Sequence, residues 1–277
     1  MKESMSRVAV IIPLYKTTLT ATEYFSFQNT LQILNQYDIY IIGPERLKDH
    51  FKAEYHDLKI KLFHNKYFAD TKGYSNLLLS KFFYKSFSNH EYILIVQTDA
   101  LVLSDQINIW CNIKYSYIGA PWFKGMETPK RPLEFLGVGN GGFSLRKVDD
   151  FLRVLSKPKY FKNKLLQDAI SKTGYQALIQ KTYHLIFFSY NFFPLFPKLN
   201  EDAFWGILAP DNCDFFLVPT PDEASRFAFE SEPEFLYQLN NQTLPFGCHA
   251  WERYGINFWR ETLKTHGFTL PDPSKVI

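Results

Sequence analysis

Continuous apolar runs, each ended by polar or turn-forming residues, divide the first part of the chain. The runs cover residues 7–13, 38–42, 60–63 and 91–96. Runs of this kind, rich in β-branched residues, are typical of strands that are covered on both faces of a sheet. Between the first two runs, residues 23–35 carry Phe25, Leu31 and Leu34 at helical spacing. This succession predicts a βαβ unit, and such units form parallel sheets through right-handed crossovers.

The rest of the chain predicts further short elements of the same α/β class. We expect helices over residues 74–87 and 105–110, strands over 117–122 and 215–219, and a helix that begins near 221. A length of 277 residues is compatible with one large α/β domain. The pattern therefore predicts a single domain over residues 1–277, with a mostly parallel, Rossmann-like central sheet that is flanked by helices.

The strand predicted over residues 91–96 ends at Gln97, Thr98 and Asp99. Ligands of open parallel sheets bind beyond the carboxyl ends of the strands. A buried carboxylate has to be hydrogen-bonded, paired or bound to a cation, because an isolated buried charge is very costly. Asp99 is therefore a candidate ligand-binding residue. The alternative is that it caps the turn and accepts hydrogen bonds from nearby backbone N–H groups.

A polar segment, residues 64–75, leads into the helix predicted over 74–87. Free N–H groups and the helix dipole at such an N-terminus attract anions. Lys66 and Lys72 add positive charge to this segment. It is a candidate anion site, and the alternative is a plain connection whose lysines are solvated.

Three motifs in the later part of the chain carry candidate chemistry. Residues 137–142 include four glycines, which permit close approach of a ligand to the backbone, although the spacing is neither that of a P-loop nor Gly-x-Gly-x-x-Gly. Glu201 and Asp202 open a predicted helix, where simple capping is the alternative role. His249 lies close to glycine and tryptophan, and a lone histidine is more often structural than a ligand.

Residues 157–199 form a segment of different composition, which we interpret as an insertion. The segment contains seven lysines against one acid, Asp168, and ends in an aromatic run. Such a segment is able to lie on an anionic membrane surface or to cover an acceptor groove. The alternative is an inserted helical hairpin that packs on the core.

Charge and cysteine usage narrow the class of protein. The balance of 31 basic against 28 acidic residues gives +3, which does not indicate a nucleic-acid partner. Three cysteines without paired or metal-knuckle spacing predict reduced thiols in a cytoplasmic protein. The apolar run over residues 8–14 lacks a small-residue cleavage site and is expected to be a strand, and no run of eighteen apolar residues predicts a membrane span.

Four motifs in this order resemble the GT-A class of glycosyltransferases. They are Gln97-Thr98-Asp99, Gly139-Asn140-Gly141-Gly142-Phe143-Ser144-Leu145-Arg146, Asn200-Glu201-Asp202-Ala203-Phe204-Trp205-Gly206 and Phe246-Gly247-Cys248-His249. The resemblance extends from about residue 7 to about residue 255 and is closest to an uncharacterised branch that is found in bacterial polysaccharide gene clusters. It implies a GT-A fold, a nucleotide-sugar donor, most simply UDP-linked, and a glycan or lipid-linked glycan acceptor.

The resemblance also implies roles for individual residues. GT-A enzymes usually carry Asp-x-Asp after the central strand, whereas this chain has Asp99-Ala100-Leu101, so that one carboxylate remains. His249 matches the late histidine that completes the metal site in many of these enzymes, and the implied cofactor is Mn²⁺ or Mg²⁺. Asp202 is the implied catalytic base, with Glu201 as the alternative.

The remaining implied contacts concern the donor and the acceptor. The donor is expected against Pro13, Tyr15, Gly43, Lys66, Lys72, Gly73, Tyr74, Asn76, Gln97, Thr98 and Asp99. The sugar and acceptor are expected against Trp122, Asn140, Gly141, Gly142 and Trp205, where each tryptophan has core packing as its alternative role.

The first hypothesis is an inverting glycosyltransferase of surface-polysaccharide synthesis. We expect such an enzyme to lie in the cytoplasm, with residues 157–199 in peripheral contact with the cytoplasmic face of the membrane. A non-catalytic carbohydrate-binding or scaffold subunit is the second, because one carboxylate of the usual pair is missing. A nucleotidyltransferase ranks last, since Tyr15-Lys16-Thr17-Thr18 is a poor phosphate loop.

Overall fold

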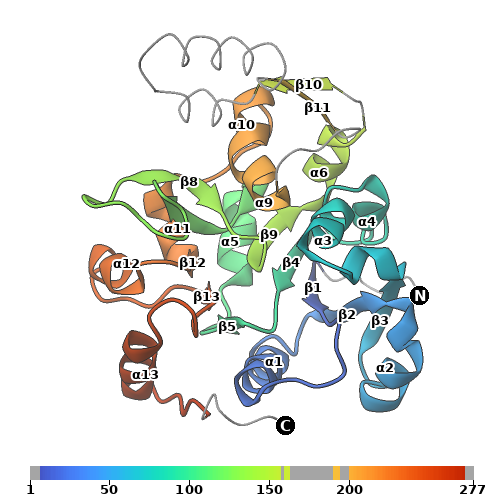
Figure 1. The fold of residues 1–277 in the computed structure, drawn as a ribbon, viewed down its shortest axis with the longest axis horizontal. Coiled ribbons are helices and arrows are strands. Elements are labelled where there is room, and N and C mark those ends of the chain that lie inside the picture. Colours follow the sequence, from blue (N-terminus) through green and yellow to red (C-terminus); the bar gives the residue numbers. More distant parts are fainter. Residues whose placement is uncertain (1–6, 157–158, 163–189, 194–199, 272–277) are drawn as a thin grey trace, which may run out of the picture.

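The computed structural model describes residues 7–156, 159–162, 190–193 and 200–271, and a six-stranded sheet lies at its centre (Figure 1). The strands, in spatial order, are β3 (Lys59–Phe63), β2 (Asp38–Pro44), β1 (Val8–Pro13), β4 (Tyr92–Val96), β9 (Phe143–Lys147) and β6 (Tyr117–Ile118). The first four are mutually parallel, and β9 is antiparallel to both β4 and β6. The predicted α/β class with a mostly parallel central sheet is confirmed.

Both faces of the sheet are covered, which explains the continuous apolar runs. Every residue of β1 and β4 is buried. Alternate residues of a strand point to opposite faces. Ala9 and Ile11 pack in a core with α3 (Thr71–Leu78), α4 (Lys81–Lys85) and α6 (Val148–Val154). Val8 and Val10 pack in a second core with α1 (Ala21–Ile33), α2 (Lys48–Glu54) and α5 (Ile107–Ile113).

A second layer of short elements lies beyond the carboxyl end of β4. It contains a three-stranded sheet of β12 (Ala228–Phe229), β13 (Gly247–His249) and β5 (Ala100–Val102), and a hairpin of β7 (Ala120–Phe123) and β8 (Phe135–Gly139). The helices α12 (Pro233–Leu239) and α13 (Ile256–Thr265) border a third core here. Figure 1 shows α12 and α13, in orange and red, on the opposite side of the molecule from α2, α3 and α4.

The acid pair opens a composite helix. It consists of α9 (Glu201–Ala203), a π-helical segment (Phe204–Leu208) and α10 (Ala209–Asn212). Gly206 within it lies against β8, because a Cβ at this position would be 1.8 Å from the carbonyl oxygen of Val138. The next helix, α11 (Pro221–Phe227), begins with a capping box between Thr220 and Glu223, as the sequence predicts for a helix near 221.

Three local predictions were wrong. The helix expected over 74–87 is broken between α3 and α4, and the strand expected over 117–122 is divided at Gly119 between β6 and β7. A Cβ on Gly119 would lie 1.6 Å from the carbonyl oxygen of Gly139, so this close crossing of two chains requires glycine. Residues 215–219 form no strand; Leu217 only shares isolated hydrogen bonds with the Ser116 region.

The predicted insertion over 157–199 lies mostly outside the described residues. Its described parts are β10 (Lys159–Lys162) and β11 (Tyr190–Phe193), which pair antiparallel. These eight positions therefore form strands. A helical hairpin had been one of the expectations for this segment. None of the helices in the described part of the chain has the length and apolarity that crossing a membrane requires.

Candidate functional site

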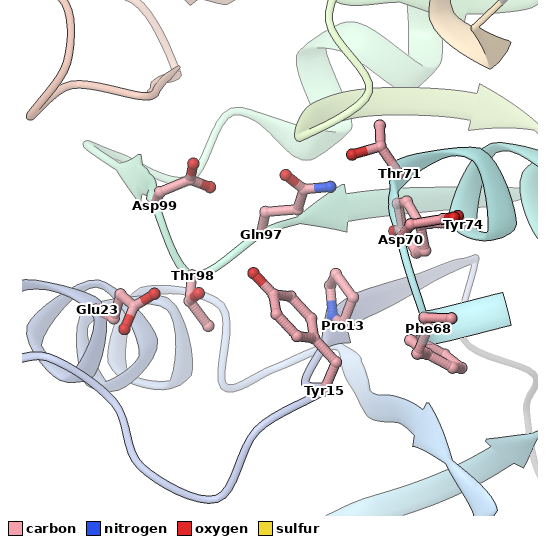
Figure 2. A pocket seen from close by; sticks show the side chains of 11 residues that line it. Pro13, Tyr15, Glu23, Phe68, Asp70, Thr71, Tyr74, Gln97, Thr98 and Asp99 are labelled. Carbon is pink, nitrogen blue, oxygen red and sulfur yellow. The ribbon is translucent and has the colours of Figure 1, made fainter. Parts of the chain in front are cut away.

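A cavity of about 390 Å³ lies at the carboxyl ends of β1 and β4 (Figure 2). Six residues predicted to bind the donor line it: Pro13, Tyr15, Tyr74, Gln97, Thr98 and Asp99. The cavity occupies this place because parallel strands deliver the residues that follow them to one edge of the sheet, and this edge is the ordinary ligand position in such folds.

The cavity has aromatic walls and a polar edge. Figure 2 shows Tyr15 extending from the end of β1 towards Gln97 and Thr98, with Phe68 and Tyr74 on the wall nearer α3. Tyr15 is 51% exposed, so its ring is available for stacking. Burial raises the pKa of Tyr74, which keeps its hydroxyl protonated as a hydrogen-bond donor.

The other residues predicted to bind the donor do not line the cavity. They are Gly43, Lys66, Lys72, Gly73 and Asn76. Gly43 is buried against Phe51, whereas the two lysines and Asn76 are exposed.

The predicted anion site at the start of α3 is already occupied by a side chain. Asp70, the N-cap residue, accepts a hydrogen bond from the Gly73 N–H at 2.6 Å. The helix start therefore offers one fewer free donor than the sequence suggests.

Asp99 lies between the cavity and His249. β13 pairs with β5 so that His249 is opposite Ala100, which brings the imidazole beside the preceding residue, Asp99. His249 Nε2 lies 3.3 Å from Asp99 Oδ1, and Nδ1 lies 2.9 Å from Glu230 Oε1. Burial lowers the pKa of His249, but Asp99 and Glu230 outweigh burial and raise it to about 10. For Asp99, burial opposes ionisation, but the interaction with His249 holds its pKa below the usual value.

The glycine-rich turn joins β8 to β9 and lies directly against these groups. Gln97 donates its backbone N–H to the Gly142 carbonyl at 2.8 Å. Asn140 adopts φ 83°, in the left-handed region, and its side-chain oxygen accepts hydrogen bonds from Gly142 N at 2.9 Å and Phe143 N at 3.1 Å. A Cβ on Gly142 would lie 2.1 Å from His249 Nε2. Glycine is needed at this position because the imidazole occupies the space of a side chain.

Glu201 and Asp202 have different environments although they are neighbours in sequence. Glu201 is 4% exposed, and both of its oxygens accept hydrogen bonds from Arg146, at 2.9 and 3.0 Å. Arg146 is fully buried, and although burial opposes its charge, the Glu201 carboxylate holds its pKa well above the ordinary value. A carboxylate held in a bidentate pair is poorly placed to take a proton from a substrate.

Asp202 contacts the glycine turn at Gly141, one residue before the position that packs on His249. Its Oδ2 accepts a hydrogen bond from Gly141 N at 3.3 Å, and its Oδ1 accepts one from Ala203 N at 2.8 Å. Burial raises the pKa of Asp202, and the negative charge of Glu230 adds to the rise. Asp99 and His249 are in contact, and Gly142 and Gly141 lie against His249 and Asp202 respectively. Of these three predicted site residues, only Asp99 lines the cavity.

The predicted sugar platforms are core residues. Trp205 is fully buried, donates its indole N–H to the Leu78 carbonyl at 3.3 Å and packs on Phe151 with ring centroids 4.1 Å apart. The prediction that it contacts a sugar is wrong, because the composite helix turns it into the core. Trp122 is 8% exposed, and its indole N–H donates to Glu230 Oε2 at 2.9 Å.

Several site residues were missed from the sequence. Glu23, Phe68, Ala69, Asp70 and Thr71 line the cavity, and Glu230 contacts His249. Glu23 also closes the capping box of α1 and pairs with Lys16 at 2.6 Å. The Thr20-x-x-Glu23 spacing gives the capping role, but nothing in the local sequence around Glu230 indicates its contact with a histidine nineteen residues later.

The residues fit a divalent metal that takes further ligands from a bound molecule. The described residues contain no group of three or more histidine, cysteine or acidic side chains that could hold a metal ion by themselves. They do bring Asp99 Oδ1 within 3.3 Å of His249 Nε2, and this buried nitrogen has no hydrogen-bond partner of good geometry in the described part of the chain. Mg²⁺ sites often use one or two protein ligands together with phosphates and water.

Comparisons with known proteins give a family and several solved structures with partial similarity. The model of the family described as "Protein of unknown function (DUF5672)" matches residues 57–249. No curated protein sequence matches the chain significantly.

Among solved structures, the galactosyltransferase LgtC, in complex with donor and acceptor sugar analogs, shares 11% identity and has a TM-score of 0.48, over 93% of this chain and 95% of that one. Mouse xyloside xylosyltransferase 1 shares 11% identity with a TM-score of 0.42, over 87% of this chain and 97% of that one. Core-mannan synthase A from Aspergillus fumigatus, in an Mn/GDP form, shares 11% identity with a TM-score of 0.36, over 55% of this chain and 62% of that one. Scores of this size assign no donor, acceptor or mechanism.

Proposed function

Because this chain belongs to the DUF5672 family, whose description gives no activity, we propose from the site itself that it is a glycosyltransferase that moves a sugar from a nucleotide-sugar donor to an acceptor hydroxyl. The observation that carries the proposal is the convergence of a strand-end cavity, the Asp99–His249 pair and Asp202 around one glycine turn. The motif resemblance to GT-A enzymes supports the same assignment.

The cavity is suited to the nucleotide part of the donor. An aromatic side chain at its edge, Tyr15, offers a face on which a base can stack, and Gln97 and Thr98 supply polar groups. The diphosphate would then lie towards Asp99, where charge has to be balanced. We propose a UDP-linked donor on the basis of the motif resemblance.

Asp202 has the properties of a general base. In the proposed inverting reaction, the acceptor oxygen attacks the anomeric carbon, the bond from that carbon to the diphosphate oxygen breaks, and the proton of the acceptor passes to Asp202. A raised pKa makes this carboxylate a stronger base than an ordinary aspartate. Glu201 is not proposed for this role, because Arg146 holds both of its oxygens.

Asp99 and His249 are the residues that would hold a divalent cation, which we propose to be Mn²⁺ or Mg²⁺. When bound, it would neutralise the charge that develops on the departing diphosphate. The Gly142 turn keeps the imidazole beside Asp99, and the pairing of β13 with β5 sets the separation of the two side chains.

The acceptor and the cellular setting are also proposed. We take the acceptor to be a hydroxyl of a glycan or lipid-linked glycan of a surface polysaccharide, used at the cytoplasmic face of the membrane, with residues 157–199 as the membrane contact. This rests on the motif resemblance and on the basic aromatic composition of that segment.

The decisive experiment incubates the full chain with a panel of UDP-sugars and Mn²⁺ and measures released UDP, with and without short glycan acceptors. We expect turnover with at least one donor, and a loss of about 10²–10⁴-fold in Asp202→Asn with retained UDP binding. The matched control is Asp211→Asn in α10, whose turnover should equal that of the wild type.

UDP or sugar binding without turnover would favour the second hypothesis, a non-catalytic carbohydrate-binding subunit. The buried Ala100 and Leu101, in place of a second carboxylate, are the feature that favours this alternative.

A further inference from the structure

Glu230 uses its two oxygens to hold two different side chains. It follows β12, and because Phe229 is paired with Cys248, the next residues in each strand, Glu230 and His249, come side by side. Oε1 lies 2.9 Å from His249 Nδ1, and Oε2 accepts the indole N–H of Trp122 at 2.9 Å. The carboxylate is mostly buried, with 17% of the side chain exposed.

The Glu230 contact decides which nitrogen of His249 faces Asp99. A carboxylate accepts hydrogen bonds only, so Nδ1 carries the proton that is shared with Oε1. The ring is thereby oriented with Nε2 towards Asp99 Oδ1, at 3.3 Å. Nε2 is buried and lacks a well-formed hydrogen bond among the described residues.

Trp122 restrains Glu230 in turn. Its indole N–H is a donor without acceptor capacity, and its ring packs so closely on β8 that a Cβ on Gly139 would lie 2.3 Å away. The rotation of the Glu230 carboxylate is therefore limited by the β7–β8 hairpin, and the orientation of His249 depends on a chain of contacts from Trp122 through Glu230.

We infer that Glu230 is a positioning residue that orients His249 Nε2 for a divalent cation shared with Asp99, and that Trp122 serves as its anchor and not as a sugar platform. Metal-bound histidines generally donate their second ring N–H to such a partner, and loss of the partner typically weakens metal binding 10–100-fold. The inference rests on the proposed donor site, but its test measures metal binding without turnover.

The test titrates Mn²⁺ into the full chain, with and without UDP, and follows the loss of the free Mn²⁺ signal by electron paramagnetic resonance. We expect the Kd to rise about 10–100-fold in Glu230→Leu, which has no acceptor. Glu230→Gln should recover part of the loss, because His249 and Trp122 donate to different oxygens of Glu230, and the glutamine amide keeps only one of these two acceptors. The exposed Glu127→Gln is the matched control and should bind Mn²⁺ as the wild type does.

A second readout follows the imidazole itself. With Mg²⁺ and UDP bound, nitrogen-15 spectra should show His249 as the Nδ1–H tautomer in the wild type, with signals assigned by their absence in His249→Asn. At the Mg²⁺ concentration that saturates the wild type, Glu230→Leu should show a smaller fraction of His249 in this metal-bound Nδ1–H form, which a merely structural role of Glu230 would leave unchanged. If Glu230→Leu does not fold, Glu230→Gln decides the question through its Mn²⁺ affinity.

The outcomes separate this inference from the proposed function. A Kd within about twofold of the wild type in the folded Glu230 variants, or turnover by a wild-type chain that binds no Mn²⁺, would overturn the inference and leave the transferase proposal standing. Weakened Mn²⁺ binding in both variants, in a protein that turns over no UDP-sugar, would support the inference and count against the proposed function.

Discussion

Two clusters of charged side chains contact neighbouring residues of the glycine turn, Gly141 and Gly142, and they differ in how completely their hydrogen-bonding groups are satisfied. In the closed cluster, Arg146 and Glu201 form a bidentate pair, and Tyr84 and Ser144 accept further hydrogen bonds from Arg146. In the open cluster, His249 is placed between Asp99 and Glu230, its Nε2 lacks a well-formed hydrogen bond within the described residues, and Asp99 faces the cavity.

The difference is the basis for proposing a structural role for the closed cluster and a ligand-binding role for the open one. A buried ion pair with every group satisfied contributes to a unique packing but has no capacity left for a ligand. A cluster with an unsatisfied nitrogen and an exposed carboxylate, 46% of whose side chain is accessible, keeps that capacity. Mutations in the closed cluster should therefore lower the free energy of unfolding. Mutations in the open cluster should weaken ligand binding and leave the free energy of unfolding nearly unchanged.

The largest effect on stability is expected from Arg146→Met. The change removes one partner and leaves the Glu201 carboxylate buried without a counter-charge, which costs about 3–5 kcal/mol. Urea titrations monitored by circular dichroism give the free energy of unfolding of the variant and the wild type, and the difference is the expected loss. The double variant Arg146→Met with Glu201→Leu should regain much of the loss; a single variant as stable as the wild type would remove the structural role assigned to the closed cluster.

Asp99→Asn should weaken activity and metal binding while changing stability little, the reverse of what is expected for Arg146→Met. We expect UDP release and Mn²⁺ affinity to fall at least about tenfold, because a ligand oxygen and its charge are altered. The free energy of unfolding should change by less than about 1 kcal/mol, since the side chain is half exposed. Calorimetric titration with UDP and Mn²⁺, beside the same urea titration, gives both quantities, and a stability loss equal to that of Arg146→Met would contradict the division into two clusters.

The smallest effect concerns the pH dependence of stability at Asp202. Its pKa is raised in the folded protein, mainly by burial, so the folded state binds the proton more tightly than the unfolded state does. Stability from this group is present below the unfolded pKa of about 3.9 and is lost as pH rises through the folded value. Asp202→Asn should therefore gain stability relative to the wild type as pH rises through this window, and paired urea titrations at several pH values measure the gain.

A constant difference between Asp202→Asn and the wild type at every pH would show that Asp202 titrates normally. Such a result would remove the special basicity of Asp202 while leaving the geometry of the cavity unchanged. Turnover measurements on the wild type over the same pH range are the natural companion, because activity should rise as Asp202 loses its proton.

Much of the scaffold follows from local sequence pattern. The apolar runs of β1 and β4 predict strands buried on both faces, and a parallel sheet presents the residues after such strands at one edge. Asp99 was therefore singled out from its position alone, whereas Tyr15, which lines the same cavity, was expected from the motif resemblance. Hydrophobic periodicity and turn-forming residues are properties of neighbouring positions in the chain, so they can be recognised without knowledge of the fold.

The roles within the site depend on contacts that no local pattern records. Glu201 and Asp202 are adjacent and chemically alike, yet only Glu201 meets Arg146, which lies 55 positions earlier. Trp122 and Glu230 are 108 positions apart, and Trp205 is drawn into the core by the composite helix that also positions Asp202.

The sequence by itself thus determined the fold class and placed Asp99 at the carboxyl end of a buried strand, because hydrophobic period and strand-end position are local properties. Asp202 and His249 were singled out by the motif resemblance, and Glu230 was not indicated at all. Only the tertiary structure decided which acid is paired with Arg146, which acid contacts His249 and which tryptophans are core, because burial and partner choice are set by residues that meet only when the chain is folded.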